Sequence, residues 1–341
     1  MPDKKRITLK DIAKDLGISV STASRALNSY SGISDDTIKL VKDYAEKHNY
    51  VPNTMAVNFR KNKTLTLGLI VPELVHYFFS SVISGALAEA KKRGYTVLVS
   101  QTEELLKNEI YAARTMIASS VDGIMISLSN ETKDGDHLKE LLEEGRPVVQ
   151  FDKVLDDLPT AKVIVDDFNG AYNAVTHLIN QGYQSIAHLN GHQDVNNSVE
   201  RLRGYKQALT DAGLETKDEY IIHCHDISEQ EGYDFTKDLM QLPDPPDAIF
   251  CITDLVAMGS MKFLKEKEVK IPDQVGIVGF SNWDMANFVT PTLSSVDQQA
   301  FKMGEKACQI LIDTLKTGEL GKDETHLIPT ELIVRQSSKR D

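Results

Sequence analysis

The chain of 341 residues is long enough for two or three domains, and its 41% hydrophobic and 26% charged residues are ordinary for a globular protein. It contains no run of 18 apolar residues, and its start, MPDKKRITLKDIAK, has no apolar segment, so we expect neither a membrane-spanning helix nor a signal peptide. The net charge of −12 is unevenly spread: residues 1–63 carry 12 Lys and Arg against 7 Asp and Glu, and the rest carries 26 against 43.

This uneven charge indicates a basic head on a large acidic body, which is typical of a DNA-binding module joined to a sensor. The alternative is an exposed N-terminal tail that holds some lysines. The three cysteines are far apart and form no C-x-x-C pair, which predicts reduced thiols in a cytoplasmic protein.

The head begins with a pattern of two short helices. Thr8 is a good N-cap for a first helix over residues 9–16, which Gly17 ends, and Ser19 is placed to cap a second helix over Val20–Leu27. Two helices that cross steeply need a small residue where they touch, and Ala13 supplies it. Alanine four residues before glycine, followed by a cap and a second amphipathic helix, is typical of a helix-turn-helix.

A third helix is expected over Ser34–His48, so the head could also be a three-helix cap that only adds stability. The second helix favours DNA binding, because its start would enter the major groove first. The side chains expected on its exposed face can contact base edges and phosphates: Val20, Ser21, Thr22, Ser24, Arg25 and Asn28.

The string TLKDIAKDLGISVSTASRALN, followed by ISDDTIKLVKDYAEKHNYVPNTMAVNFRKNKT and LGLIVP, resembles the LacI/GalR repressor family, and the resemblance runs from Thr8 to about Arg335. It implies that Val20 and Ser21 read bases with Arg25 beside them. It also implies a DNA-binding set comprising Thr8, Val20, Ser21, Thr22, Ser24, Arg25, Asn28, Tyr50, Asn53, Met55, Ala56 and Phe59.

The resemblance identifies residues 53–60 as a hinge helix that folds only on DNA and inserts an apolar side chain into the minor groove. The family has leucine at the inserting position, and this chain has Phe59. An aromatic wedge is physically reasonable, because apolar side chains unstack base steps. The alternative is a linker whose Phe59 docks on the body.

From Thr64 onward, strand-like runs alternate with amphipathic helices, which predicts parallel α/β sheets. VDGIMIS followed by RPVVQFD resembles PDAIFCIT followed by VGIVGFS, so the body looks like two similar lobes. The expected strands are Leu65–Val71, Tyr95–Ser100, Gly123–Ser127, Val148–Phe151, Ala161–Val165, Ser185–Leu189, Tyr220–His223, Ala248–Ile252, Val275–Phe280 and Ser294–Val296.

The predicted fold class is therefore an N-terminal all-α helix-turn-helix DNA-binding domain plus an α/β two-lobed sensor. By the resemblance, the sensor is of the type I periplasmic-binding-protein kind. We expect the DNA-binding domain over residues 1–51, the hinge helix and linker over 52–63, and the effector-binding and dimerisation domain over 64–341.

Ligands of open α/β sheets bind at the carboxyl ends of the strands, so polar residues that follow the strands are the first candidates for an effector site. Together with nearby aromatic residues and an arginine that the family resemblance supports, the candidates are Phe78, Phe79, Ser127, Asp152, Arg201, Thr253, Asp254, Ser281 and Trp283. Such groups suit a hydroxylated, sugar-sized ligand.

Among these residues, Asp254 has an alternative role and Ser281 departs from the family's pattern. Asp254 could instead cap the helix that follows its strand. The family frequently has aspartate where this chain has Ser281, so a usual ligand carboxylate is missing, and we expect Trp283 to compensate by stacking on the ligand.

No catalytic or cofactor motif is present in the sequence. His223, Cys224 and His225 resemble metal ligands, but neighbouring residues on a strand point to opposite faces, so we expect no metal. We predict a cytoplasmic, non-enzymatic homodimer that binds pseudo-palindromic double-stranded operator DNA and is controlled by a small carbohydrate-like effector. A solute-binding protein and an α/β enzyme are the alternatives.

Overall fold

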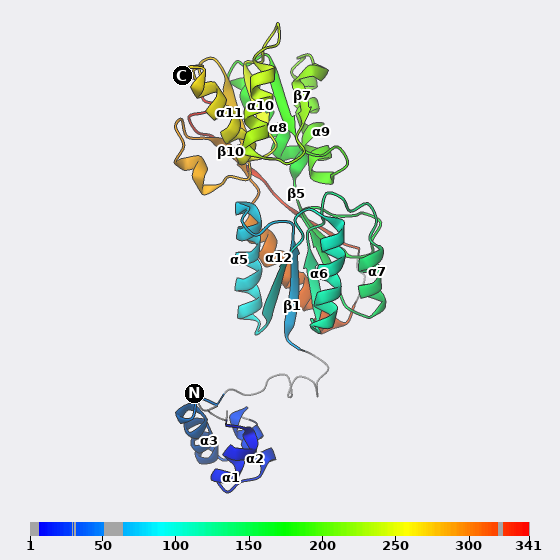
Figure 1. Ribbon diagram of the computed structural model, residues 1–341, viewed down its shortest axis with the longest axis vertical. Coiled ribbons are helices and arrows are strands. Elements are labelled where there is room, and N and C mark those ends of the chain that lie inside the picture. The colour runs from blue at the N-terminus through cyan, green and yellow to red at the C-terminus, as the bar shows by residue number, and fades with distance from the viewer. Residues whose placement is uncertain (1–6, 29, 31, 51–63, 320–322, 341) are drawn as a thin grey trace. The chain divides into compact units, whose positions relative to one another are not determined.

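The computed structural model describes residues 7–28, 30, 32–50, 64–319 and 323–340, which belong to two compact units, residues 1–64 and 65–341. Figure 1 shows the helices of the first unit and the two sheets of the second. None of the helices within the described ranges is long and apolar enough to cross a membrane.

The first unit contains the three predicted helices. They are α1 (Leu9–Asp15), α2 (Val20–Leu27) and α3 (Asp35–Lys47). The predicted caps Thr8 and Ser19 are confirmed, and Ser34 caps α3 in the same way: each side chain accepts a hydrogen bond from the third residue of the helix that follows. A small buried core formed by Ile12, Ala26, Val41 and Ala45 joins the helices.

The second unit consists of two lobes, each built on a six-stranded sheet. Lobe 1 has the strand order β11-β5-β4-β3-β1-β2, and lobe 2 has the order β12-β10-β9-β8-β6-β7. In lobe 1 the strands are β1 (Thr66–Val71), β2 (Thr96–Gln101), β3 (Gly123–Ile126), β4 (Val148–Phe151), β5 (Ala161–Val165) and β11 (Thr325–Ile328). In lobe 2 they are β6 (Ile186–Asn190), β7 (Ile221–His223), β8 (Ala248–Cys251), β9 (Gly276–Phe280), β10 (Ser294–Asp297) and β12 (Glu331–Ile333).

Helices surround both sheets (Figure 1). Lobe 1 has α5 (Tyr77–Lys92), α6 (Leu106–Ala118), α7 (Asp136–Glu143) and α12 (Ala300–Thr317). Lobe 2 has α8 (Asp167–Asn180), α9 (Asn196–Asp211), α10 (Glu229–Leu239) and α11 (Asp254–Glu266), with short 3₁₀ turns at Asp218–Tyr220 and Asp284–Asn287.

The strand predictions are confirmed with small changes at the ends, but two strands were not expected. β11 and β12 are short and lie at sheet edges, and none of their residues is buried, so neither has the continuous apolar run of the central strands. β12 also pairs with β10 antiparallel, so the prediction of parallel sheets is wrong at this edge.

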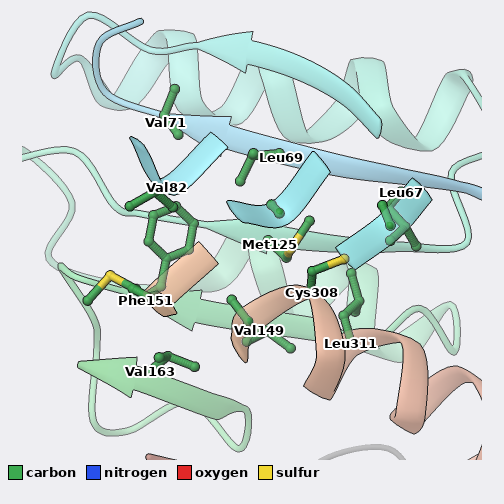
Figure 2. Close-up of a cluster of buried hydrophobic side chains, with 14 of the residues drawn as sticks. Leu67, Leu69, Val71, Val82, Met125, Val149, Phe151, Val163, Cys308 and Leu311 are labelled. Carbon is green, nitrogen blue, oxygen red and sulfur yellow. The ribbon is translucent and has the colours of Figure 1, made fainter. Parts of the chain in front are cut away.

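The core of lobe 1 is completed by a helix from the far end of the chain. In Figure 2, Cys308 and Leu311 of α12 lie against Met125 and Val149 of the sheet. α12 crosses α5 so closely that a Cβ at Gly304 would collide with the carbonyl oxygen of Val82. In lobe 2, α11 crosses α10 in the same way, with Gly259 facing the carbonyl oxygen of Glu229.

The chain passes between the lobes three times: after β5, after β10 and after β11. Hydrogen bonds tie these crossings together. The Gln299 side chain donates to the carbonyl oxygen of Pro329 at 2.6 Å, and the Thr330 hydroxyl donates to the carbonyl oxygen of Asp166 at 3.4 Å. Gln299 itself has a φ of +51°, in the left-handed region. The three crossings therefore form one connected junction between the lobes.

Candidate functional site

Most of the predicted DNA-contacting residues of the first unit lie on α2, while Thr8 caps α1 and Tyr50 follows α3. Thr8, Val20, Ser21, Arg25 and Asn28 are exposed, whereas Thr22, Ser24 and Tyr50 are partly buried. At the start of α2, the Ser19 hydroxyl lies 2.8 Å from the hydroxyls of both Ser21 and Thr22. The helix therefore presents hydroxyl groups at its N-terminal end and the guanidinium of Arg25 in its last turn.

The predicted hinge residues Asn53, Met55, Ala56 and Phe59 lie outside the residues that the structure describes. Their roles remain predictions.

In the second unit, Asp152 joins the two lobes. It follows β4 of lobe 1 with a φ of +60°, and its carboxylate accepts hydrogen bonds from the Ser127 hydroxyl at 3.2 Å and from the Asn197 amide of lobe 2 at 3.3 Å. The amide of Asn196 donates to its carbonyl oxygen at 3.3 Å. Burial raises the pKa of Asp152, opposed by the positive charges of Lys153 and Arg201. A carboxylate is thus buried where lobe 1 meets α9.

Arg201 is 3% exposed and lies on α9 near that carboxylate. Its Nε donates to Asp167 at 2.8 Å, another guanidinium nitrogen donates to the carbonyl oxygen of Ile252 at 2.7 Å, and the guanidinium stacks 3.7 Å above the ring of Phe280. Burial raises the pKa of Asp167 to about 7 even with this partner. Arg201 is therefore held rigidly within lobe 2, near the carboxylate of Asp152.

A strained turn after β9 carries Ser281 and Trp283. Ser281 and Asn282 have positive φ values of +114° and +50°, which residues other than glycine seldom adopt. Asp254 holds the turn, since it accepts from the backbone N–H of Trp283 at 2.6 Å and from the Ser295 hydroxyl at 2.5 Å. Burial raises the pKa of Asp254 to about 6.

The alternative that Asp254 caps the next helix is wrong. Thr253 is the N-cap of α11, and its hydroxyl accepts from the backbone N–H of Val256 at 3.4 Å. Thr253 and Asp254 therefore have structural partners in addition to the effector roles predicted for them.

Trp283 meets lobe 1 at His76, with the ring centroids 4.8 Å apart and the rings edge to face. Among the described residues, Trp283 Nε1 and His76 Nδ1 are buried without a hydrogen-bond partner. Burial lowers the pKa of His76 to about 4, so this imidazole is neutral at physiological pH. Such unsatisfied polar atoms are costly unless a ligand or water meets them.

Phe78 and Phe79 were predicted to stack on the effector, and the structure places both in the hydrophobic core of lobe 1. Phe79 also contacts His76, with ring centroids 5.7 Å apart. Phe78 packs edge to face on Phe79.

Sequence reasoning missed Asp167, Asn196, Asn197 and His76. Asp167 follows β5 by two residues, so the rule that selected Asp152 would have found it. The asparagines begin α9, and only the folded chain shows that they meet lobe 1. Within the described ranges, no three His, Cys, Asp or Glu residues are placed to hold a metal, and His223 Nδ1 bonds to the carbonyl oxygen of Gly191 at 2.9 Å.

Comparison with known proteins adds two family matches. The pattern described as "Bacterial regulatory proteins, lacI family" matches residues 8–53, and the "Periplasmic binding protein-like domain" matches residues 175–338. Among curated relatives, the HTH-type transcriptional repressor PurR of Vibrio atlanticus (strain LGP32) is 30% identical over 334 residues, which cover 97% of this chain and 98% of that repressor.

Two solved structures extend the likeness over nearly the whole chain. The lac repressor dimer bound to operator and the anti-inducer ONPF matches with a TM-score of 0.88 at 23% identity, covering 98% of this chain and 100% of that one. The complex of the transcriptional regulator CelR with cellobiose matches with a TM-score of 0.74 at 26% identity, covering 97% and 100%. These matches confirm the predicted fold class.

Proposed function

Because the chain belongs to the LacI family of DNA-binding transcriptional repressors, we propose that it binds an operator through α2 and a sugar-like effector between its lobes. The observation that carries the proposal is the buried carboxylate of Asp152, which accepts from both lobes beside Arg201. An effector that competes for Asp152 would change the contact between the lobes and thereby the affinity for DNA. Membership of a repressor family also confirms that the chain is not an enzyme.

The proposed division is residues 1–51 for DNA binding, 52–63 for the hinge, and 64–341 for effector binding and dimerisation. A single helix-turn-helix covers one half-site, so the functional unit is a cytoplasmic homodimer on a pseudo-palindrome. The solved relative is a lac repressor dimer bound to operator.

A sugar or sugar derivative is the proposed effector class. Carboxylate, amide and guanidinium groups beside aromatic rings suit a ligand with several hydroxyls. A hydroxyl can both donate and accept, so it could satisfy the unpartnered Trp283 Nε1 and His76 Nδ1. The CelR relative has cellobiose bound, which supports the same class.

Arg25→Ala should weaken operator binding about tenfold or more, because an arginine contact to a base is worth about 1–3 kcal/mol. The operator is selected with the wild-type chain from random duplexes, and the affinities are then measured by fluorescence anisotropy at one salt concentration. Lys39→Ala, which removes one exposed positive charge from α3, is the matched control and should change affinity far less. Equal losses in the two variants would show that α2 has no special role.

A thermal-shift screen against mono- and disaccharides, sugar phosphates and nucleosides tests the effector site, since a ligand of the folded state raises the melting temperature. Asp152→Asn keeps the shape of the side chain but removes the charge, so it should abolish the shift given by any sugar that stabilises the wild type. A full shift in this variant would move the site away from Asp152.

A further inference from the structure

A cavity lies between the lobes next to Asp152, and no predicted effector residue lines it. Its volume is about 360 Å³. Lobe 1 contributes the loops after β3 and β4, including Lys133 and Lys153, and lobe 2 contributes Asp194 and Asn196 at the start of α9. We call it the lysine cavity. Asn196 connects it to the proposed effector site, because its amide donates to the carbonyl oxygen of Asp152.

The lobe 1 wall of the lysine cavity is fixed before any ligand arrives. Glu109, fully buried, accepts from the backbone N–H of Ser129 at 2.6 Å and from the Thr132 hydroxyl at 3.0 Å, and it lies 2.8 Å from Nε2 of His137. These bonds hold the loop after β3. A wall ordered in this way needs little further ordering when a ligand binds.

Lys153 is also fixed. It is 7% exposed, and its ammonium donates to the Glu104 carboxylate at 2.5 and 2.6 Å and to the Asn130 amide oxygen at 2.9 Å. Lys133 differs, because its side chain is 76% exposed and its ammonium lies 3.4 Å from the 81% exposed carboxylate of Asp194. Because an ion pair between two such exposed groups contributes little to stability, Lys133 is available to bind another anion.

The other wall adds positive potential. α9 spans 16 residues and has no side-chain cap, and the backbone N–H groups of its first turn are at the positive end of the helix dipole. Together with the exposed ammonium group of Lys133, this favours an anion, whereas the charge of Lys153 is already matched by Glu104. Asp194 opposes it, and is the group that an entering anion would displace from Lys133.

We propose that the lysine cavity binds an oxyanion group of the effector, a phosphate ester or a carboxylate, while the hydroxylated part of the same molecule lies at Asp152. The inference rests on the proposed effector site. It names the class of ligand more narrowly: an acidic sugar derivative rather than a neutral sugar.

The test titrates the full chain with inorganic phosphate, and separately with acetate, replacing chloride at constant ionic strength and pH and following binding by calorimetry. Lys133→Gln should weaken phosphate binding about three- to tenfold, which corresponds to at most about 1.4 kcal/mol. Asp194→Asn should strengthen it, because the competing carboxylate is gone. Acetate binding that Lys133→Gln weakens and Asp194→Asn strengthens would favour a carboxylate group on the effector. A lack of acetate binding would favour a phosphate ester.

The matched control is Lys139→Gln. Lys139 is a half-exposed lysine on α7 whose ammonium is 2.8 Å from Asp136, and it does not line the cavity. The inference is overturned if phosphate binds wild type, Lys133→Gln and Lys139→Gln equally, or not at all. It is also overturned if Asp194→Asn weakens binding. In those cases a sugar-induced thermal shift that Asp152→Asn abolishes would still support the proposed effector site, so the two failures are distinguishable.

Discussion

Replacing Arg201 by alanine is expected to lower the free energy of unfolding of the body by about 3 kcal/mol or more at pH 8, because it leaves a buried carboxylate without its partner. Asp167 and Arg201 are both about 4% exposed in their side chains. The loss of the guanidinium also removes the contacts with Ile252 and Phe280. Urea denaturation followed by the fluorescence of Trp283, the one tryptophan of the chain, measures the effect.

The loss of stability caused by Arg201→Ala should depend on pH. The pKa of Asp167 is about 7 in the folded protein, above its ordinary value of 3.8. A raised pKa means that ionisation of this group costs stability as the pH rises from about 4 through 7. Without Arg201 that cost grows, so the difference between variant and wild type should be largest above pH 7 and smaller at pH 5.5, where Asp167 is protonated.

The double variant Asp167→Asn with Arg201→Ala separates charge from packing. It buries no unpaired charge, so it should regain part of the stability lost by Arg201→Ala and lose the extra pH dependence. If the double variant were less stable than Arg201→Ala at pH 8, the unpaired carboxylate would not be the cause.

Gly304→Ala should destabilise lobe 1 by about 3 kcal/mol, since overpacking at a tight contact forces the backbone to move. The added Cβ would meet the carbonyl oxygen of Val82, a backbone atom that cannot turn aside. Gly213→Ala is the control. Gly213 has a φ of +69° but no atom within 4 Å of an added Cβ, so only the left-handed backbone is penalised, by about 1 kcal/mol.

Melting temperatures and urea midpoints of the two variants test whether Gly304→Ala is less stable than Gly213→Ala. A Gly304→Ala protein as stable as Gly213→Ala would mean that α5 and α12 separate without cost.

The sequence predicted most of the fold because its signals are local. Helix caps such as Ser19 and buried apolar strands such as β8 depend on residues close in the chain. β11 could not be found in this way, since a short edge strand is specified by its pairing with β5, about 160 positions earlier. The return of α12 to lobe 1 is also invisible locally, because its apolar face would suit either lobe.

The site was predicted in part for the same reason. The rule that ligands bind after strands selected Asp152, but it could not show that Asn197 of the other lobe would donate to it. Phe78 was predicted to contact the effector from its place at the start of a helix and from the resemblance, but its side chain fills the hydrophobic core of lobe 1. Arg201 was selected from the resemblance, and its pairing with Asp167 emerged only from the folded chain.

The three passages between the lobes fix an order of events during synthesis. The segment that forms α1 to α3 carries its own core and can fold soon after it leaves the ribosome. Lobe 1 cannot do so, although β1 to β5 are made early, because α12 and β11 belong to its sheet and core and lie beyond residue 299. Until they are synthesised, α5 and the apolar face of the sheet remain exposed to solvent. By that time every strand of lobe 2 except β12 has been synthesised. The first lobe to be translated is therefore among the last parts to become native, and in that interval it is the part most in need of a chaperone.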